Sequence, residues 1–370
     1  MKIGVNARFL IEGRLEGIGW FCHEVISRMV RQYPQHEFYL FFDRPFSQKF
    51  IFSNNVHGVV LNPPARHPVL WYWWFERSIP AALKKFKCDV FLSMDGFGSL
   101  SLEIPQHIVI HDLAYLHFPQ HIKWLHEKYY RYFIPKFLHK ADFIYTISKA
   151  TKEDVVNNLK VDSEKIEICY NGCKEMFVPL SKEEISEVRN KYTNSCPYFL
   201  FVGALHPRKN VHGLIKAFDE FKKTDLQNFK LVIVGRKAWL TGIIEEAYQS
   251  AIYKGHIIFL EDLDNAQLAK VTGSAFAAIS PSFLEGFGVP VLEALYCDVP
   301  VLCSNTFSLP EISGPGAILF DPQNIQSITD AIKKISSENN FTSRIELGRI
   351  HRAQFTWDKT AQIICNGIFT

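Results

Sequence analysis

Short apolar runs alternate along the chain with segments in which apolar residues recur every three to four positions. This alternation is typical of a parallel β-sheet with buried strands and with helices covering its faces. In the first half it predicts strands at residues 2–5, 38–42, 90–92, 108–110, 143–147 and 166–169. Helices are predicted between them at residues 19–31, 79–86, 122–139 and 149–158.

The pattern turns polar around residues 178–191, which we take as the boundary between two domains. A second alternation follows, with strands predicted at residues 198–202, 230–234, 257–260, 277–279, 299–302 and 317–320. Its helices are predicted at residues 212–222, 242–251, 266–271, 290–296 and 325–336, and a tail helix at residues 355–369.

Two such alternations predict an α/β fold of two doubly wound, Rossmann-like domains facing each other across a cleft. The expected bounds are 1–178 for the N-terminal domain, 192–350 for the C-terminal domain and 351–370 for the tail. In open parallel sheets, ligands bind beyond the carboxyl ends of the strands. We therefore look for the chemistry in the loops that follow the predicted strands.

Composition narrows the function classes. The 370 residues are 47% hydrophobic and 21% charged, as in soluble globular proteins. A net charge of +3 without a long basic run does not suggest nucleic-acid binding. The eight cysteines form no C-x-x-C pair and no zinc-like spacing, so we expect reduced, mostly buried thiols of a cytoplasmic protein. The start resembles a strand rather than a signal peptide, and no apolar run approaches membrane-spanning length.

The most informative string is S-F-L-E-G-F-G-V-P-V-L-E-A at residues 282–294. Pro290 suits the first turn of a helix, where its missing N–H costs nothing. Gly286 and Gly288 precede it and allow a ligand to approach the backbone closely. N–H groups at a helix start attract phosphate, and the carboxylates of Glu285 and Glu293 can accept hydrogen bonds from sugar hydroxyls.

This string resembles the E-x7-E signature of the retaining GT-B glycosyltransferases of glycosyltransferase family 4. The resemblance extends over most of the chain, through residues 111–113, 147–149, 170–172, 201–210, 309–311 and 355–357. The sequence departs from the family pattern at Ala204, where a basic residue is usual, and at Asp298, where a glycine is usual. We expect the role of Asp298 to be structural.

The resemblance implies roles for particular residues. Glu293 would hold the ribose of a donor nucleotide, and Glu285 would contact the transferred sugar. Arg208 and Lys209 would neutralise the diphosphate without a metal ion, which agrees with the charge that develops on such a leaving group. The resemblance also implies an acceptor-binding N-terminal domain, a donor-binding C-terminal domain and a tail helix that packs back on the first. Further donor contacts are implied for Gly203, Gly286, Phe287, Gly288 and Val289.

His111 and the turn Gly17-Ile18-Gly19 are the candidates in the first half. The resemblance implies that His111 reaches the donor sugar and acts in catalysis together with Glu285, Arg208 and Lys209. Gly17 and Gly19 would let the backbone approach the donor phosphate or the acceptor. A dinucleotide fingerprint at this turn is disfavoured, because Cys22 stands where the third glycine is required.

Two aromatic and basic stretches, at residues 66–87 and 122–140, leave two interpretations open. Their spacing fits the buried faces of helices, and we favour core packing. The alternative is an interface for anionic lipid or for a lipid-linked acceptor, with peripheral contact at the inner membrane face.

The resulting hypothesis is a retaining hexosyltransferase that uses a nucleoside diphosphate sugar, with GDP-mannose as first choice and a UDP-sugar as second. The expected acceptor is a glycan or lipid-linked glycan in cell-surface polysaccharide synthesis. Two alternatives remain, a non-catalytic relative that binds sugar nucleotides and a sugar-nucleotide epimerase on the same fold.

Overall fold

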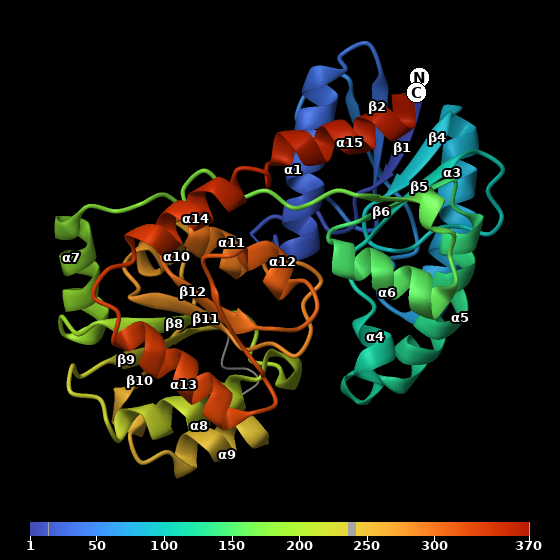
Figure 1. Cartoon of the computed structure of the whole chain (residues 1–370). Coiled ribbons are helices and arrows are strands. Elements are labelled where there is room, and N and C mark those ends of the chain that lie inside the picture. The colour runs from blue at the N-terminus through green and yellow to red at the C-terminus, as the bar shows by residue number, and fades with distance from the viewer. Residues whose placement is uncertain (14, 236–241, 370) are drawn as a thin grey trace. The chain divides into compact units, whose positions relative to one another are not determined.

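A computed structural model describes residues 1–13, 15–235 and 242–369, which form two compact units (Figure 1). The first unit comprises Met1–Gly172 and the C-terminal stretch from Thr356, and the second comprises Cys173–Phe355. The boundary thus lies before the polar stretch at 178–191 in which we expected it. The reason is packing, since α7 (Lys182–Thr193) contacts α10 (Asn265–Gly273) and Arg189 Nε donates a hydrogen bond to Ser274 O at 2.9 Å.

The described residues of the first unit form a parallel sheet of seven strands in the order β3-β2-β1-β4-β5-β6-β7. The strands are β1 (Lys2–Asn6), β2 (Glu37–Phe42), β3 (Val56–Val60), β4 (Val90–Ser93), β5 (Gln106–Ile110), β6 (Phe143–Thr146) and β7 (Ile166–Ile168). The helices are α1 (Gly17–Gln32), α2 (Pro68–Trp73), α3 (Ile79–Phe86), α4 (Ala114–His117), α5 (Trp124–Lys140), α6 (Lys149–Leu159) and α15 (Trp357–Phe369). Strand β3 was not expected, because this short edge strand is interrupted by Gly58.

The described part of the second unit forms a parallel sheet of six strands in the order β10-β9-β8-β11-β12-β13. The strands are β8 (Tyr198–Val202), β9 (Lys230–Val234), β10 (Ile257–Leu260), β11 (Ala277–Ser280), β12 (Val301–Ser304) and β13 (Ile318–Phe320). Besides α7 and α10, the helices are α8 (Val211–Lys222), α9 (Ile243–Ser250), α11 (Val289–Tyr296), α12 (Leu309–Ser313), α13 (Ile325–Ser336) and α14 (Thr342–Arg352). Two doubly wound parallel sheets confirm the predicted α/β class.

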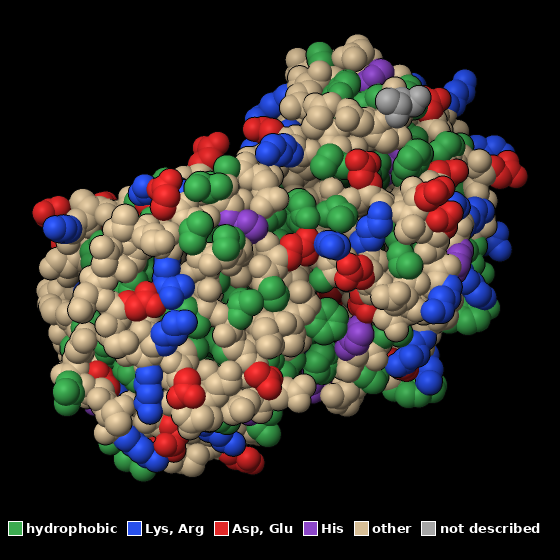
Figure 2. Space-filling view, viewed as in Figure 1, with side chains coloured by type: hydrophobic (Ala, Val, Ile, Leu, Met, Phe, Trp, Pro, Cys, Tyr) green, Lys and Arg blue, Asp and Glu red, His purple; other side chains and the backbone are tan. Residues whose placement is uncertain are grey.

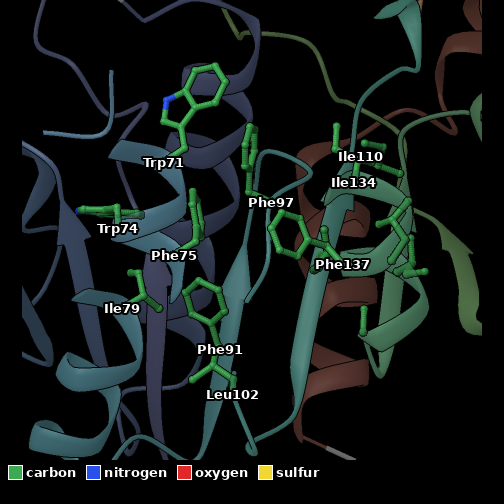
Figure 3. Packing of buried hydrophobic residues seen from close by; sticks show 14 of the residues in the cluster. Trp71, Trp74, Phe75, Ile79, Phe91, Phe97, Leu102, Ile110, Ile134 and Phe137 are labelled. Carbon is green, nitrogen blue, oxygen red and sulfur yellow. The ribbon is translucent and has the colours of Figure 1, made fainter. Parts of the chain in front are cut away.

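The core of the first unit is rich in aromatic side chains. Phe97 packs against both Phe75 and Phe137, with ring centroids 5.2 and 6.3 Å away (Figure 3). Trp74 is fully buried, and Trp71 stacks on Tyr130 with an interplanar angle of 9°. Part of the two aromatic stretches is therefore core, as favoured, whereas other rings of the same stretches are exposed.

The C-terminal helix α15 packs against α1 within the first unit (Figure 1). Near its end, Phe369 stacks on Tyr33 and His36, with ring centroids 4.3 and 4.5 Å apart. At its start, a Cβ on Gly172 would lie 2.4 Å from Trp357 N, so only glycine allows this approach. Two of the matched motifs, at 170–172 and 355–357, thus join the tail to the end of the first sheet. Residue 370 of the expected tail lies outside the described residues.

Six of the eight cysteines are buried, whereas Cys173 and Cys196 are half-buried, and all eight are free thiols. Across the described ranges, none of the helices combines the length and the hydropathy needed to cross a lipid bilayer.

Candidate active site

The strand order of the second sheet reverses between β8 and β11. In open α/β sheets, ligands bind beyond the carboxyl ends of the strands at such a switch point. β8 ends at Val202 and β11 at Ser280, so the loops 203–210 and 281–288 both begin there. These two loops carry the predicted residues Arg208, Lys209 and Glu285.

The loop after β8 is held close to the end of β9 and to the loop after β11. A Cβ on Gly235 would lie 2.2 Å from Gly203 O, so the two backbones meet where a side chain has no room. The 3-10 turn η5 (Pro207–Lys209) follows, and His206 Nδ1 caps it by accepting a hydrogen bond from Arg208 N at 3.2 Å. The Phe283 N–H donates to Arg208 O at 3.0 Å and ties this loop to the loop after β11.

Two hydroxyl groups hold the loop after β11 in place. Ser308 Oγ lies 2.8 Å from Glu285 O and 2.9 Å from Phe287 O, and Thr306 Oγ1 donates to Phe283 O at 3.2 Å. Gly288 has a φ of +98°, and a Cβ there would lie 2.7 Å from Leu309 Cδ2. Glycine is thus required where the loop turns into α11.

Glu285 is the centre of an ion cluster made by both loops. Its Oε1 accepts hydrogen bonds from Lys209 Nζ at 2.5 Å and from Ser282 Oγ at 2.7 Å. Burial alone would raise the pKa of Glu285. The charges of Lys209 and Arg208 and the two hydrogen bonds outweigh this effect and hold the pKa below its usual value. Glu285 is therefore an ionised, acceptor-only side chain at neutral pH.

Glu293, on the buried side of α11, has the opposite electrostatics. Its Oε1 lies 3.6 Å from Lys174 Nζ, and Lys174 also donates to Asn265 Oδ1 at 3.2 Å. Burial raises the pKa of Glu293 to about 7, and Lys174 opposes this only in part. Both forms of the carboxyl are thus populated near neutrality.

His111 belongs to the first unit, directly after β5. Its Nε2 lies 2.8 Å from Met94 O, and because a carbonyl only accepts, Nε2 carries the hydrogen. Burial lowers the pKa of His111, so the ring is neutral and Nδ1 is a hydrogen-bond acceptor. The ring of Phe21 meets it edge-on at 5.1 Å and orients it.

Gly17 and Gly19, also in the first unit, differ in their surroundings. A Cβ on Gly19 would lie 2.7 Å from Phe9 O, so this glycine is required by packing. A Cβ on Gly17, the first residue of α1, would meet no atom within 4 Å. Packing therefore does not explain a glycine at position 17.

Of the predicted residues, the structure brings Arg208, Lys209 and Glu285 together, with Gly286, Phe287, Gly288 and Val289 in the continuing loop and helix start. Sequence reasoning missed Lys174, Thr306 and Ser308. Their contacts join residues far apart in the chain, and no local pattern signals them. Asp298, expected to be structural, has a φ of +59° and forms ion pairs with Arg349 at 2.6 Å and Arg352 at 2.9 Å.

Comparison with known proteins assigns each half of the chain to a family. Residues 15–175 match Glycosyltransferase Family 4, and residues 181–348 match Glycosyl transferases group 1. A relative from Escherichia coli, "O-antigen chain mannosyltransferase B", is 26% identical over 98% of this chain and 98% of its own length. The "O-antigen chain mannosyltransferase RfbU" of Salmonella typhimurium is 26% identical over 78% of this chain and 79% of its own.

Solved structures share the fold at low identity. Sucrose-phosphate synthase from Thermosynechococcus elongatus matches with a TM-score of 0.79 and 16% identity, covering 99% of this chain and 97% of that chain. Anabaena HepE in complex with UDP-glucose matches with a TM-score of 0.75 and 16% identity, covering 100% and 99%. The two doubly wound sheets thus have the GT-B fold, and the family matches and the two sequence relatives identify the chain as a glycosyltransferase. The chain belongs to glycosyltransferase family 4 in its N-terminal half and to the group 1 glycosyl transferases in its C-terminal half.

Proposed function

We propose that this glycosyltransferase transfers a mannosyl residue from GDP-mannose to a glycan or lipid-linked glycan, with retention of the anomeric configuration. The names of the two O-antigen mannosyltransferases quoted above support the choice of sugar and the acceptor class. A UDP-sugar is the second choice, because HepE was solved with UDP-glucose.

The ion cluster around Glu285 is the observation that carries the proposal. An ionised carboxylate in the loop before α11 can accept hydrogen bonds from the hydroxyls of the transferred sugar. The cations of Lys209 and Arg208 stand beside it, where they would neutralise the donor diphosphate. Because negative charge grows on the diphosphate as the glycosidic bond breaks, fixed cations there lower the barrier. In this proposal the transfer is metal-independent.

Glu293 is proposed to hold the two ribose hydroxyls of the donor nucleotide. Both hydroxyls donate best to the charged carboxylate, so ribose binding would favour ionisation of a group whose pKa is about 7 in the free protein. Gly203, Gly286, Phe287, Gly288 and Val289 would supply backbone contacts to the donor.

The first unit is proposed to bind the acceptor, and His111 to contact the transferred sugar. Since Nδ1 of the neutral ring is an acceptor, His111 would take a hydrogen bond from a sugar hydroxyl rather than give a proton. Gly17 would let the backbone of α1 approach the donor phosphate or the acceptor, because no packing contact explains this glycine.

The proposed transfer needs no separate general base. The acceptor hydroxyl oxygen forms its bond to the anomeric carbon on the face from which the nucleoside diphosphate departs. The hydroxyl proton passes to a phosphate oxygen of the leaving group, so the charge on the leaving group is reduced as it forms.

A thermal-shift panel of GDP-mannose, UDP-glucose and ADP-glucose tests the donor. A ligand present at 100 times its Kd stabilises the folded protein by about 2.7 kcal/mol, and we expect the largest rise in melting temperature with GDP-mannose. Glu285→Gln should abolish sugar transfer to a mannan-type acceptor while preserving most of the shift with GDP alone. A matched control is Glu338→Gln, which removes a carboxylate paired with Arg344 on the surface of the same unit.

Product analysis separates the alternatives. An epimerase would return an altered nucleotide sugar without any acceptor, and a non-catalytic relative would bind the donor without consuming it. Transfer from a UDP-sugar in preference to GDP-mannose would overturn the donor assignment. Full turnover by Glu285→Gln would overturn the site.

A further inference from the structure

The exposed parts of the two aromatic stretches form one surface of the first unit. A groove of about 710 Å³ lies between α2 and α5, lined by Pro68, Val69, Tyr72, Leu125, Lys128, Tyr129, Arg131, Tyr132 and Phe133. Trp124 is 71% exposed and Trp73 56% exposed, and Val69, Tyr72, Leu125 and Tyr132 are also exposed. Large apolar side chains gathered in this way on a soluble protein mark a contact surface.

The two segments that form this surface carry more basic than acidic side chains. In residues 66–78 and 123–140 the exposed Lys and Arg side chains are Arg66, Arg77, Lys123, Lys128, Arg131, Lys136 and Lys140. Two of them, Lys128 and Arg131, pair with Glu127. Within residues 66–78 and 123–140, all of which are described, the two acidic side chains, Glu76 and Glu127, are buried. Figure 2 shows Lys and Arg side chains beside hydrophobic ones over the region where Figure 1 labels α5.

The buried half of each stretch keeps this surface in shape. Trp71 packs between the helices, on Tyr130 and Tyr129 of α5, and its Nε1 donates to Ala65 O at 2.8 Å. Glu76 accepts backbone hydrogen bonds from Leu100 and Ser101 at 2.8 and 3.0 Å. The neighbouring rings Tyr72, Trp73 and Trp124 are therefore presented outward by helices that are themselves fixed.

We propose that this groove and its rim dock the first unit on a bilayer of anionic phospholipids. Tryptophan and tyrosine have an apolar ring and a polar tip, which suits the boundary between acyl chains and headgroups. Lys123, Lys128 and Lys136 can extend apolar stems along the lipid and place their charges at the phosphate level. Lys128 and Arg131 line the groove, and Lys136 Nζ lies 3.4 Å from the centroid of the Tyr132 ring. Cations thus stand beside exposed aromatic rings, which is the combination that an anionic lipid surface attracts.

Docking on a bilayer would place the acceptor-binding unit where a lipid-linked acceptor lies. The docking itself does not depend on the proposed donor or on turnover. The docking proposal can therefore be wrong while the proposed transferase activity is right, and it can be right while the proposed donor is wrong.

Co-sedimentation of the full chain with vesicles tests the proposal. We expect binding to vesicles of phosphatidylglycerol and phosphatidylcholine, and little binding to phosphatidylcholine alone. Binding should weaken as salt shortens the Debye length from about 10 Å at 0.1 M to about 3 Å at 1 M. Trp73→Ser with Trp124→Ser should lower the partition coefficient at least about tenfold, and Lys123→Glu with Lys136→Glu by a similar factor.

Matched controls come from the second unit. Ile252 is 74% exposed, so Ile252→Ser removes a comparably exposed apolar group, and Lys270→Glu with Lys333→Glu makes the same change in net charge. These variants should bind vesicles as the unaltered chain does. Equal loss in controls and surface variants, or no binding to anionic vesicles, would overturn the proposal. The proposal would also be overturned if the surface variants, but not the controls, changed their oligomeric state without lipid and still bound vesicles normally.

Discussion

The two sheets have the same strand order around their switch points, and each places an ion pair there. In the first unit, Arg8 Nε lies 2.6 Å from Asp95 Oδ2, beyond the ends of β1 and β4. In the second, Lys209 Nζ lies 2.5 Å from Glu285 Oε1, beyond β8 and β11. The first pair is sealed, with side-chain exposures of 6% and 1%, whereas the second retains 17% and 12%.

The surroundings explain this difference. The Arg8 guanidinium lies over the rings of Phe97 at 4.4 Å and Phe75 at 5.2 Å, and Asp95 also accepts a hydrogen bond from Asn6 Nδ2 at 2.8 Å. Ser93 Oγ and the Phe97 N–H also donate to Asp95 Oδ1, at 3.2 and 3.3 Å, so this carboxylate already has several partners within the unit. Lys209 has a flexible stem and no ring above it in the described contacts, so its charge can turn to a diphosphate. One topology thus supplies a structural pair in the first unit and, in the second, the pair that we propose to bind the donor.

The largest expected effect is on stability in the first unit. Arg8→Ala leaves the buried Asp95 without its countercharge and should lower the free energy of unfolding by about 3–5 kcal/mol. Urea denaturation at pH 7 measures it. A loss below about 1 kcal/mol, typical of an exposed ion pair, would show that the pair is not sealed.

The next effect concerns Glu293, the buried glutamate of α11, and the sign of its contribution to stability follows from the raised pKa. The folded state binds this proton more tightly than the unfolded state, so the stability from this group is full below pH 4.5 and is lost as pH rises to about 7. That loss amounts to about 3 kcal/mol for a shift of this size. In Glu293→Gln, the fall in unfolding free energy between pH 5 and 8 should be smaller by this amount. Parallel stability curves for the two proteins would contradict the assignment.

Lys209→Ala should cost less stability than Arg8→Ala, about 2 kcal/mol, because the pair is partly hydrated. Lys209→Ala should nevertheless remove most of the thermal shift that GDP-mannose produces. The Arg8→Ala variant should still bind GDP-mannose at temperatures where this variant is folded. Isothermal titration at 10 °C compares the two variants. Equal donor affinity in Lys209→Ala and the unaltered chain would contradict a ligand-binding role.

The smallest effects separate two glycines at the starts of α11 and α1. Gly288→Ala forces a side chain into positive φ against Leu309 and should cost about 1–2 kcal/mol. Gly17→Ala enters open space and should change stability by less than about 1 kcal/mol. If Gly17→Ala lowers turnover without lowering the melting temperature, the backbone at position 17 is close to a substrate. Unchanged turnover would make Gly17 an ordinary helix start.

Local patterns predicted several elements with their exact bounds, whereas the long helices expected at 19–31 and 122–139 differ by one or two residues at each end. The strands Tyr198–Val202 and Lys230–Val234 and the helix Ile325–Ser336 agree with prediction at both ends. The strand expected at 299–302 begins instead at Val301, because Val299 N donates back to Ala294 O at 3.0 Å and Pro300 has no N–H to donate to a neighbouring strand. The separate helix α14 was not expected, since its apolar face is narrow and its sequence is largely polar.

The sequence alone determined that Glu285 lies in a loop with glycines before a helix, and that Arg208 and Lys209 follow a strand. It could do so because turns and helix starts depend on residues that are neighbours in the chain. Only the tertiary structure decided which charge faces which. Lys209 is 76 residues from Glu285 in the sequence but contacts it at 2.5 Å, whereas Lys174 lies 3.6 Å from Glu293. The pKa of Glu285 is therefore lowered and that of Glu293 raised. Periodicity likewise predicted aromatic helices, but only packing decided that Trp71 and Trp74 are buried while Trp73 and Trp124 face outward. Burial and pairing depend on contacts between distant segments, and these arise only when the chain is folded.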